Sequence, residues 1–364
     1  MASKAKCCPK CGKEISGNDA CMFCHIVPET YQKKWNKLGT KANVYYFDKS
    51  LQPITNDDKN NTTYDPNNGG NVKNFMGEWD YYILTKDDQK EIKDTPRCIE
   101  NYFSKEIENL WSGVYELFIG GNIGKDKPKA NKVISKSVCD VWKEHYATTK
   151  ETVSAIAQSD FDGFGFIFNE IDKFIWMQHF RRLENMYPYL IEVYRMCKQP
   201  YNCFSNEFIR TCYLYLLHDC IMDKPNNILQ KVLLVKNEKF SPVAIFATET
   251  TKFILSDNPV IYNIGLRLDK NLGSGLYMAI SPSVLIAYLD LSKWREKQPE
   301  MKKDDLIVVA GTDDFIQYYN KLLLDRSYTK VGFNSTDIKK HIATDLSKTY
   351  SFNEMFGIEQ RSEF

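Results

Sequence analysis

Hydrophobic positions along the chain follow two different patterns. In residues 98–235 apolar side chains recur at helical spacing, whereas in residues 240–330 they form short runs separated by Gly, Asn and Pro. The sequence therefore predicts an α+β fold with a helical middle and a mainly antiparallel β-rich region. The predicted helices of the middle part span 98–119, 135–146, 166–187 and a segment that Ser205 caps and that ends at Met222.

Elements are also expected on both sides of these two parts. On the N-terminal side the pattern predicts a short helix over Tyr31–Trp35 and a strand over Val44–Phe47, followed by an Asn-, Asp- and Gly-rich loop at 51–74. On the C-terminal side, 306–311 is either a strand or the start of a helix. Two C-terminal helices that close the β-rich region are expected at 313–325, capped by Thr312, and at 335–347. We expect a zinc-knuckle segment at 1–30 and a single domain over 25–350.

Composition narrows the class of protein. The chain has 364 residues, of which 43% are hydrophobic and 26% charged, so wholesale disorder is excluded. Lys and Arg (48) nearly balance Asp and Glu (47), and the formal net charge of +1 gives no general attraction to nucleic acid. The N-terminal segment lacks the apolar stretch of a secretory signal, and no apolar run reaches the ~20 residues that span a bilayer. We expect a cytoplasmic protein with no membrane partner; the sequence does not indicate its oligomeric state.

Four of the 11 cysteines form two Cys-x-x-Cys pairs near the N-terminus, nine residues apart. Such pairs let four thiolates face one tetrahedral Zn²⁺, and an odd number of cysteines argues against a complete set of disulfides. The predicted ligands of this structural Zn²⁺ are Cys8, Cys11, Cys21 and Cys24. Cys7 and His25 are alternatives to a neighbouring ligand.

The other cysteines, Cys98 among them, show no ligand spacing. Cys212 and Cys220 lie in an apolar stretch with His218, where a metal site is one interpretation. Buried thiols beside a histidine on a helix surface are the favoured one, because uncharged cysteines pack as small apolar side chains.

Three short polar segments carry more side-chain chemistry than packing requires: His25-Ile-Val-Pro28, Gln178-His-Phe-Arg-Arg182 and Ser256-Asp-Asn-Pro259. In the second, Gln178 and Arg182 are four residues apart and are expected on one helix face. A guanidinium on that face is suited to bind phosphate or carboxylate. The alternative is that these side chains form a solvated helix face.

The third and first segments each have two interpretations as well. Asp257 and Asn258 offer a carboxylate and an amide for metal binding or for orienting a base, but spacing alone favours a turn in which they bond their own backbone.

His25 follows a cysteine pair, as the general base of HNH nucleases does. Those nucleases need further His or Asn ligands, and this chain has no histidine between His25 and His145.

Taken in order, these segments resemble the bacterial and phage family of the domain of unknown function 4238, over about residues 25–330. The resemblance includes Tyr31 and Trp35, the late Asn320, and the segments at 44–49, 77–82, 253–261 and 277–289. The zinc knuckle precedes the matching part, and Leu255 stands where the family often has Thr. The resemblance implies that His25, Gln178, Arg181, Asp257 and Asn258 converge on one site, but it implies no particular reaction.

Together these observations lead us to expect a metal-dependent nuclease or other phosphodiesterase, an effector in conflict between bacteria and phages such as antiviral defence or a toxin. We expect His25 to act as general base or metal ligand, and Asp257 to bind or orient the Mg²⁺ or Mn²⁺ of the reaction. Arg181 is expected to hold phosphate and Asn258 to position it. The alternative is a non-enzymatic zinc-bearing module that binds nucleic acid or a protein partner.

Overall fold

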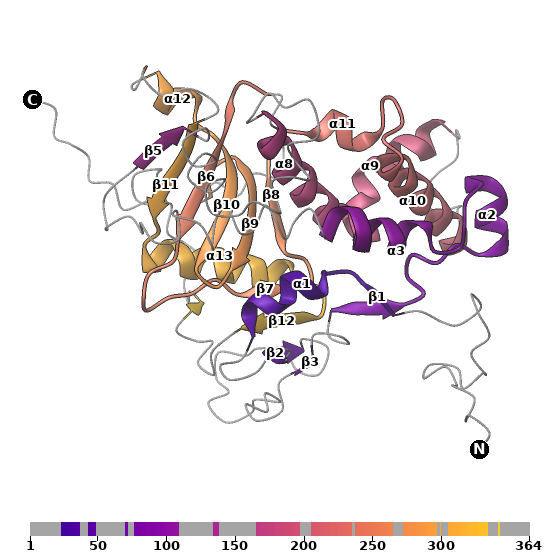
Figure 1. Ribbon diagram of the computed structural model, residues 1–364, viewed down its shortest axis with the longest axis horizontal. Helices are drawn as coiled ribbons and strands as arrows, with labels where there is room; N and C mark the ends of the chain where they lie inside the picture. Colours follow the sequence, from indigo (N-terminus) through magenta and orange to yellow (C-terminus); the bar gives the residue numbers. More distant parts are fainter. Residues whose placement is uncertain are drawn as a thin grey trace, which may run out of the picture.

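The computed structural model of the chain (Figure 1) describes residues 23–36, 43–48, 70–71, 76–108, 134–137, 165–196, 205–234, 237–264, 272–296, 299, 305–333 and 341–342. Within these ranges, most helices gather at one end of the molecule and a six-stranded sheet lies at the other. The predicted α+β class is confirmed. No helix in the described ranges is long and apolar enough to cross a membrane.

The largest sheet occupies the β-rich part of the chain. Its strands, in spatial order, are β5 (Ile134–Ser137), β11 (Asp305–Ala310), β6 (Phe240–Phe246), β10 (Val284–Asp290), β9 (Gly275–Ser281) and β8 (Val260–Asn263). All neighbours are antiparallel except β11 and β6, which run parallel. The segment 306–311 therefore contributes a strand and not the start of a helix.

The centre of this sheet is covered on both faces. Every residue of β6 and β9 is buried, and β10 is buried up to Leu289. Strands with two covered faces are apolar without alternation, which explains the continuous runs in the sequence. Helix α13 (Asp313–Arg326) packs against the sheet, where the hydroxyl of Tyr319 accepts a hydrogen bond from the backbone N–H of Ala279 at 3.2 Å.

Two smaller sheets join distant parts of the chain. One has the order β3 (Gly70–Asn71), β2 (Asn43–Asp48), β12 (Lys330–Phe333) and β7 (Leu255–Ser256), and the other pairs β1 (Phe23–His25) with β4 (Gly77–Trp79). The strand predicted at 44–47 is confirmed in β2. Strand β12 was not predicted, and it brings β7 beside the N-terminal part of the chain.

The helices of the middle part lie beside β8 (Figure 1). The remaining helical elements are α1 (Glu29–Gln32), the 3₁₀ turn η2 (Lys33–Trp35), α2 (Lys86–Ile92), α3 (Cys98–Tyr102), the π-helical turn η4 (Phe103–Ile107), α8 (Gly165–Phe180), α9 (Leu183–Met196), α10 (Asn206–Ile221), α11 (Ile228–Val232) and α12 (Ser292–Arg295). The short helix expected near Tyr31 is thus found as α1 and η2.

Two helix starts follow the predicted capping chemistry. The Ser205 hydroxyl accepts the backbone N–H of Phe208 at 3.1 Å, and the Thr312 hydroxyl accepts that of Phe315 at 3.2 Å. A side-chain oxygen at this position satisfies one of the amides that a helix leaves unbonded at its start. The starts of α10 and α13 are therefore encoded locally, as the sequence indicated.

The continuous helix predicted over 166–187 is wrong, because the chain breaks between α8 and α9 at Arg181 and Arg182. Hydroxyl groups take over the hydrogen bonds of the ending helix: Tyr82 and Tyr213 both donate to the carbonyl of Arg181, at 2.7 and 2.9 Å. The expectation that Gln178 and Arg182 share a helix face fails for the same reason. Arg181 and Arg182 lie between the two helices, and their side chains bond different partners.

The helix predicted over 135–146 is wrong at its start, where 134–137 form β5 and pair with β11. An edge strand takes its hydrogen bonds from a distant partner, which a local period does not reveal. The rest of that helix, most of the loop at 51–74 and most of the helix at 335–347 lie outside the described residues, as does the zinc-knuckle segment up to residue 22.

Candidate metal centre

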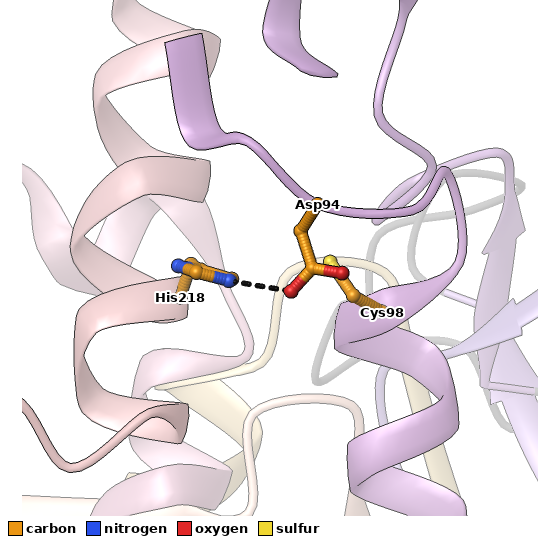
Figure 2. Close-up of side chains that lie close together, drawn as sticks. All are labelled: Asp94, Cys98 and His218. Carbon is orange, nitrogen blue, oxygen red and sulfur yellow. Dashed lines mark hydrogen bonds and ion pairs between the residues drawn. The ribbon is translucent and has the colours of Figure 1, made fainter. Parts of the chain in front are cut away.

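A cluster of three potential metal ligands lies where the α2–α3 loop meets α10. Asp94 is in that loop, Cys98 is the first residue of α3 and His218 is in the last turn of α10. One ligand atom from each lies within 4.8 Å of the other two, and Nε2 of His218 is 2.9 Å from Oδ2 of Asp94 (Figure 2). We call these three residues the candidate metal centre.

A residue that caps α2 also joins the two segments of the candidate metal centre. Thr85 and Asp88 cap α2 reciprocally, and the same Asp88 carboxylate accepts hydrogen bonds from Arg210 at 2.9 Å and Thr211 at 2.7 Å. These bonds attach α2 to the first half of α10. The loop that follows α2 therefore runs along α10 and places Asp94 opposite His218.

The electrostatics of the centre keep the thiol protonated and the carboxylate charged. Burial raises the pKa of Cys98 to about 11, and the charge of Asp94 adds to the effect. Burial acts to raise the pKa of Asp94 as well, but hydrogen bonds from His218 and from the Thr95 backbone outweigh it and lower that pKa. A nucleophilic cysteine needs a lowered pKa, and burial acts on Cys98 in the opposite direction.

The donor set suits a metal ion that can replace the thiol proton. Carboxylate oxygen, imidazole nitrogen and thiolate sulfur are all ligands of Zn²⁺, and three protein ligands leave one position for water or substrate. Binding through Nε2 of His218 moves the ring proton to Nδ1, which is buried without a hydrogen-bond partner among the described residues. A buried Nδ1–H without an acceptor costs about 1–3 kcal/mol of free energy. This cost is well below the ~10–16 kcal/mol with which zinc-finger peptides bind Zn²⁺.

The sequence-predicted site residues lie elsewhere and are held in buried contacts. Arg181 is fully buried: Nη1 donates to the His25 carbonyl at 3.0 Å, Nη2 pairs with Glu108 at 3.2 Å, and the guanidinium stacks on the ring of Phe103 at 4.0 Å. Glu100 lies beside it, and burial raises its pKa to about 7 although the charge of Arg181 opposes that shift. The contacts with His25, Phe103 and Glu108 support a role for Arg181 in fastening β1 to η4.

Of the four predicted zinc ligands, Cys8, Cys11 and Cys21 lie outside the described residues. Cys24 is in β1 and fully buried, and burial raises the pKa of its thiol to about 12, although the backbone amides of Tyr82 and Tyr81 act to lower it. The predicted zinc knuckle stays a prediction.

Asp257 directly follows β7, and its carboxylate accepts several hydrogen bonds from residues at the start of β12. Its carboxylate accepts from Arg182 at 3.1 Å and from the segment that leads into β12: the backbone N–H groups of Tyr328, Thr329 and Lys330 and the hydroxyl of Thr329. The Arg182 guanidinium also donates to Glu78 at 3.0 Å. A carboxylate with this many donors is already satisfied, so its contacts support a structural role and not that of a metal ligand.

Asn258 belongs to the same hydrogen-bond network. Its backbone N–H donates to the Ser256 hydroxyl at 3.0 Å, so the side chain that makes this turn is that of Ser256. The predicted turn, in which the Asp257 and Asn258 side chains bond their own backbone, is wrong, because both side chains bond distant segments. Its side chain accepts from Asn185 and donates to the carbonyl of Arg326, both at 3.0 Å. Asn320 likewise bonds backbone groups of Lys252 and Ile254.

The structure therefore brings the polar segments together only in part. His25 contacts Arg181, and the next residue, Arg182, contacts Asp257, whose neighbour is Asn258. Gln178 is buried in α8, and neither of its side-chain polar atoms has a hydrogen-bond partner among the described residues. The histidine of its segment, His179, packs against the rings of Trp176 and Tyr262.

The candidate metal centre was missed from the sequence. His218 was interpreted as a surface histidine beside Cys212 and Cys220, whereas it is 4% exposed and faces Asp94 and Cys98. The available signal was the Asp94-x-x-x-Cys98 spacing at a helix start, but its third ligand lies 120 residues further on. Comparisons with protein families, with curated proteins and with solved structures find no match to this chain. The resemblance to the domain of unknown function 4238 family stays a prediction.

Proposed function

We propose that this chain is a metal-dependent hydrolase that cleaves phosphodiester bonds, with its divalent ion at the candidate metal centre. The observation that carries the proposal is the approach of three different ligand types, from Asp94, Cys98 and His218, to within 4.8 Å of one another. The choice of phosphodiesters comes from the sequence expectation of a nuclease. The biological setting implied by the family resemblance is conflict between bacteria and phages.

The partial exposure of the centre supports a catalytic role over a purely structural one. Asp94 and Cys98 are partly exposed and His218 is buried, so the ligand set is open to solvent on one side. A bound divalent ion with three protein ligands supplies Lewis acidity and lowers the pKa of water at its open position. Before an ion binds, Asp94 and His218 hold each other in place across their 2.9 Å contact, and a bound ion would replace this hydrogen bond.

The residues first assigned to the reaction take a different part in this proposal. Arg181 bonds His25 and Glu108, and Asp257 bonds Arg182 and the segment at the start of β12, so we assign both residues to the framework that holds α8, β1 and β12 together. Neither residue contributes a ligand to the candidate metal centre. Substitutions there are expected to act through stability, whereas substitutions at the centre are expected to act on turnover.

The test is a cleavage assay with Zn²⁺, Mn²⁺ or Mg²⁺ and a panel of single- and double-stranded DNA, RNA and tRNA. We expect cleavage by the unaltered chain, and loss of it in His218→Gln and Cys98→Ser. Cys212→Ser is the matched control, because Cys212 is on the same helix as His218 and outside the centre. Failure to cleave any substrate, or unchanged cleavage in both centre variants, contradicts the proposal.

A second candidate function is a non-enzymatic zinc-bearing module that binds a protein or a nucleic acid. It is favoured by the exposed apolar side chains of α9, of α10 and of the residue that follows α10: Tyr187, Ile191, Phe208, Tyr215 and Met222 are between 37% and 56% exposed. Exposed apolar side chains on neighbouring helices are typical of contact surfaces. Binding to a member of the substrate panel without cleavage favours this candidate over the hydrolase.

A further inference from the structure

The ligand chemistry of the candidate metal centre points to one class of ion. We propose that Asp94, Cys98 and His218 bind Zn²⁺, or an ion with the same preferences such as Co²⁺, and not the Mg²⁺ or Mn²⁺ expected for a nuclease. This inference deepens the proposed function and rests on it, because it concerns the same site.

The argument begins with the atoms that the centre offers. Mg²⁺ selects oxygen ligands in octahedral geometry and usually keeps several waters, and Mn²⁺ also prefers oxygen donors. Here only Asp94 offers oxygen, while Cys98 offers sulfur and His218 nitrogen. Sulfur and imidazole nitrogen together select zinc-class ions.

The spacing of the three donors fits a tetrahedral ion after a small rearrangement. Bonds of about 2.0–2.3 Å to Zn²⁺ hold tetrahedral donors roughly 3.3–3.6 Å apart. The Asp94 and His218 donors are now 2.9 Å apart, joined by a hydrogen bond, and no pair in the centre is more than 4.8 Å apart. Shifts of about one ångström are therefore enough, and Asp94 lies in the loop between α2 and α3, where it is partly exposed.

The positions of the ligands predict how the ion affects the molecule. Two ligands come from the α2–α3 segment and one from the end of α10, so a bound ion joins two helical elements that are distant in sequence. Cys98 enters the complex as a thiolate, with its proton released to solvent as the sulfur–metal bond forms. One coordination position is left for water, on the side where Asp94 and Cys98 are partly exposed.

The experiment measures metal binding directly and does not depend on turnover. Chelator-treated full-length protein is titrated with Co²⁺, and sulfur-to-cobalt charge-transfer absorption and bound ions per chain are recorded. The predicted N-terminal cysteines also bind Co²⁺, so the readout is the difference between variants. We expect Cys98→Ser to bind about one ion fewer per chain than Cys212→Ser, with a matching loss of charge-transfer absorption.

A second variant keeps the test valid if Cys98→Ser does not fold. His218→Gln retains the thiol, and it too is expected to bind about one ion fewer per chain, with circular dichroism confirming its helix content. Equal ion content in Cys98→Ser, His218→Gln and Cys212→Ser overturns the inference. So does a centre that binds Mn²⁺ or Mg²⁺ but not Zn²⁺.

The two proposals fail in different ways. Zinc-class binding at the centre without cleavage of any substrate supports this inference and contradicts the hydrolase. Cleavage that needs Mg²⁺ or Mn²⁺, with no Zn²⁺ bound by Cys98 and His218, contradicts this inference and leaves the hydrolase standing.

Discussion

At the scale of single residues, two adjacent arginines organise buried charge around the break between α8 and α9. Arg181 reaches Glu108 and the His25 carbonyl, while Arg182 reaches Asp257 and Glu78. Their segment stood out from the sequence because polar side chains interrupt an apolar pattern. The sequence did not reveal that the guanidinium groups are buried, because their partners lie 73 to 156 residues away.

The ion pair between Arg182 and Asp257 makes a prediction about stability. Asp257→Asn is expected to lower the free energy of unfolding by about 3–5 kcal/mol, because the buried Arg182 guanidinium loses its buried charged partner and keeps only the half-exposed Glu78. Urea unfolding measures this. The control is Asp325→Asn, which removes an exposed pair with Lys321 and should cost under about 1 kcal/mol. Equal losses in the two variants would count against a structural role for Asp257.

His179 predicts how stability depends on pH. Burial, with a smaller effect from the charge of Arg326, lowers its pKa from 6.5 to about 4. Below pH 6.5 the unfolded chain binds more protons at this residue than the folded chain does. The contribution of His179 is therefore fully present above pH 6.5 and is lost as the pH falls toward 4. His179→Phe should flatten this part of the curve of unfolding free energy against pH; an unchanged slope would show that His179 is not the cause.

At the scale of elements, the sequence was most informative where the determinants of structure are local. Ser205 and Thr312 marked the starts of α10 and α13, because a capping hydroxyl acts on the next turn of the same helix. The break at Arg181 and the strand β12 were missed, because tyrosine hydroxyls and Asp257 from distant segments stabilise them. Local patterns therefore predicted how these helices begin but not where α8 ends.

The cap of α10 is a test of the local determinants. Ser205→Ala is expected to destabilise the protein by about 1 kcal/mol, since the Phe208 amide loses its acceptor. Ser205→Asp retains a good cap and should change little. Thermal or urea unfolding of both variants checks this, and an equal loss in both would mean that the hydroxyl does more than cap the helix.

Gly275 tests the packing of the central strands. A Cβ at this position would overlap the carbonyl oxygen of Tyr288 in the neighbouring strand β10, whereas at Gly311 the nearest atom would be 3.1 Å away. We expect Gly275→Ala to cost about 2 kcal/mol or more and Gly311→Ala to cost clearly less. Urea unfolding of the pair measures the difference. A larger loss at Gly311 would contradict the described pairing of β9 with β10.

At the scale of the whole molecule, the fold brings a metal-ligand set together from segments that show no common motif. The α+β class and the mainly antiparallel sheet were predictable from hydrophobic patterns. The candidate metal centre was not, because His218 meets Asp94 and Cys98 only after α2 and α3 pack on α10. The packing of α2 on α10 and the approach of His218 to Asp94 both depend on contacts between residues more than 100 positions apart.

A bound ion is expected to stabilise the contact between the α2–α3 segment and α10. Adding Zn²⁺ to chelator-treated protein should raise the midpoint of thermal unfolding, because an ion that binds only the folded chain stabilises it. Part of that rise is expected from the predicted N-terminal site, so the rise in Cys212→Ser is compared with that in His218→Gln. A smaller rise in His218→Gln supports the centre, and identical rises contradict it.

The most direct test of the central claim is anomalous diffraction from crystals grown with Zn²⁺, recorded on both sides of the zinc absorption edge. A metal-dependent centre at Asp94, Cys98 and His218 predicts an anomalous peak among their three side chains, within bonding distance of about 2.0–2.3 Å of each donor. Crystals of the same protein that show zinc bound elsewhere, with no peak between these residues and the 2.9 Å contact of His218 with Asp94 intact, would contradict it.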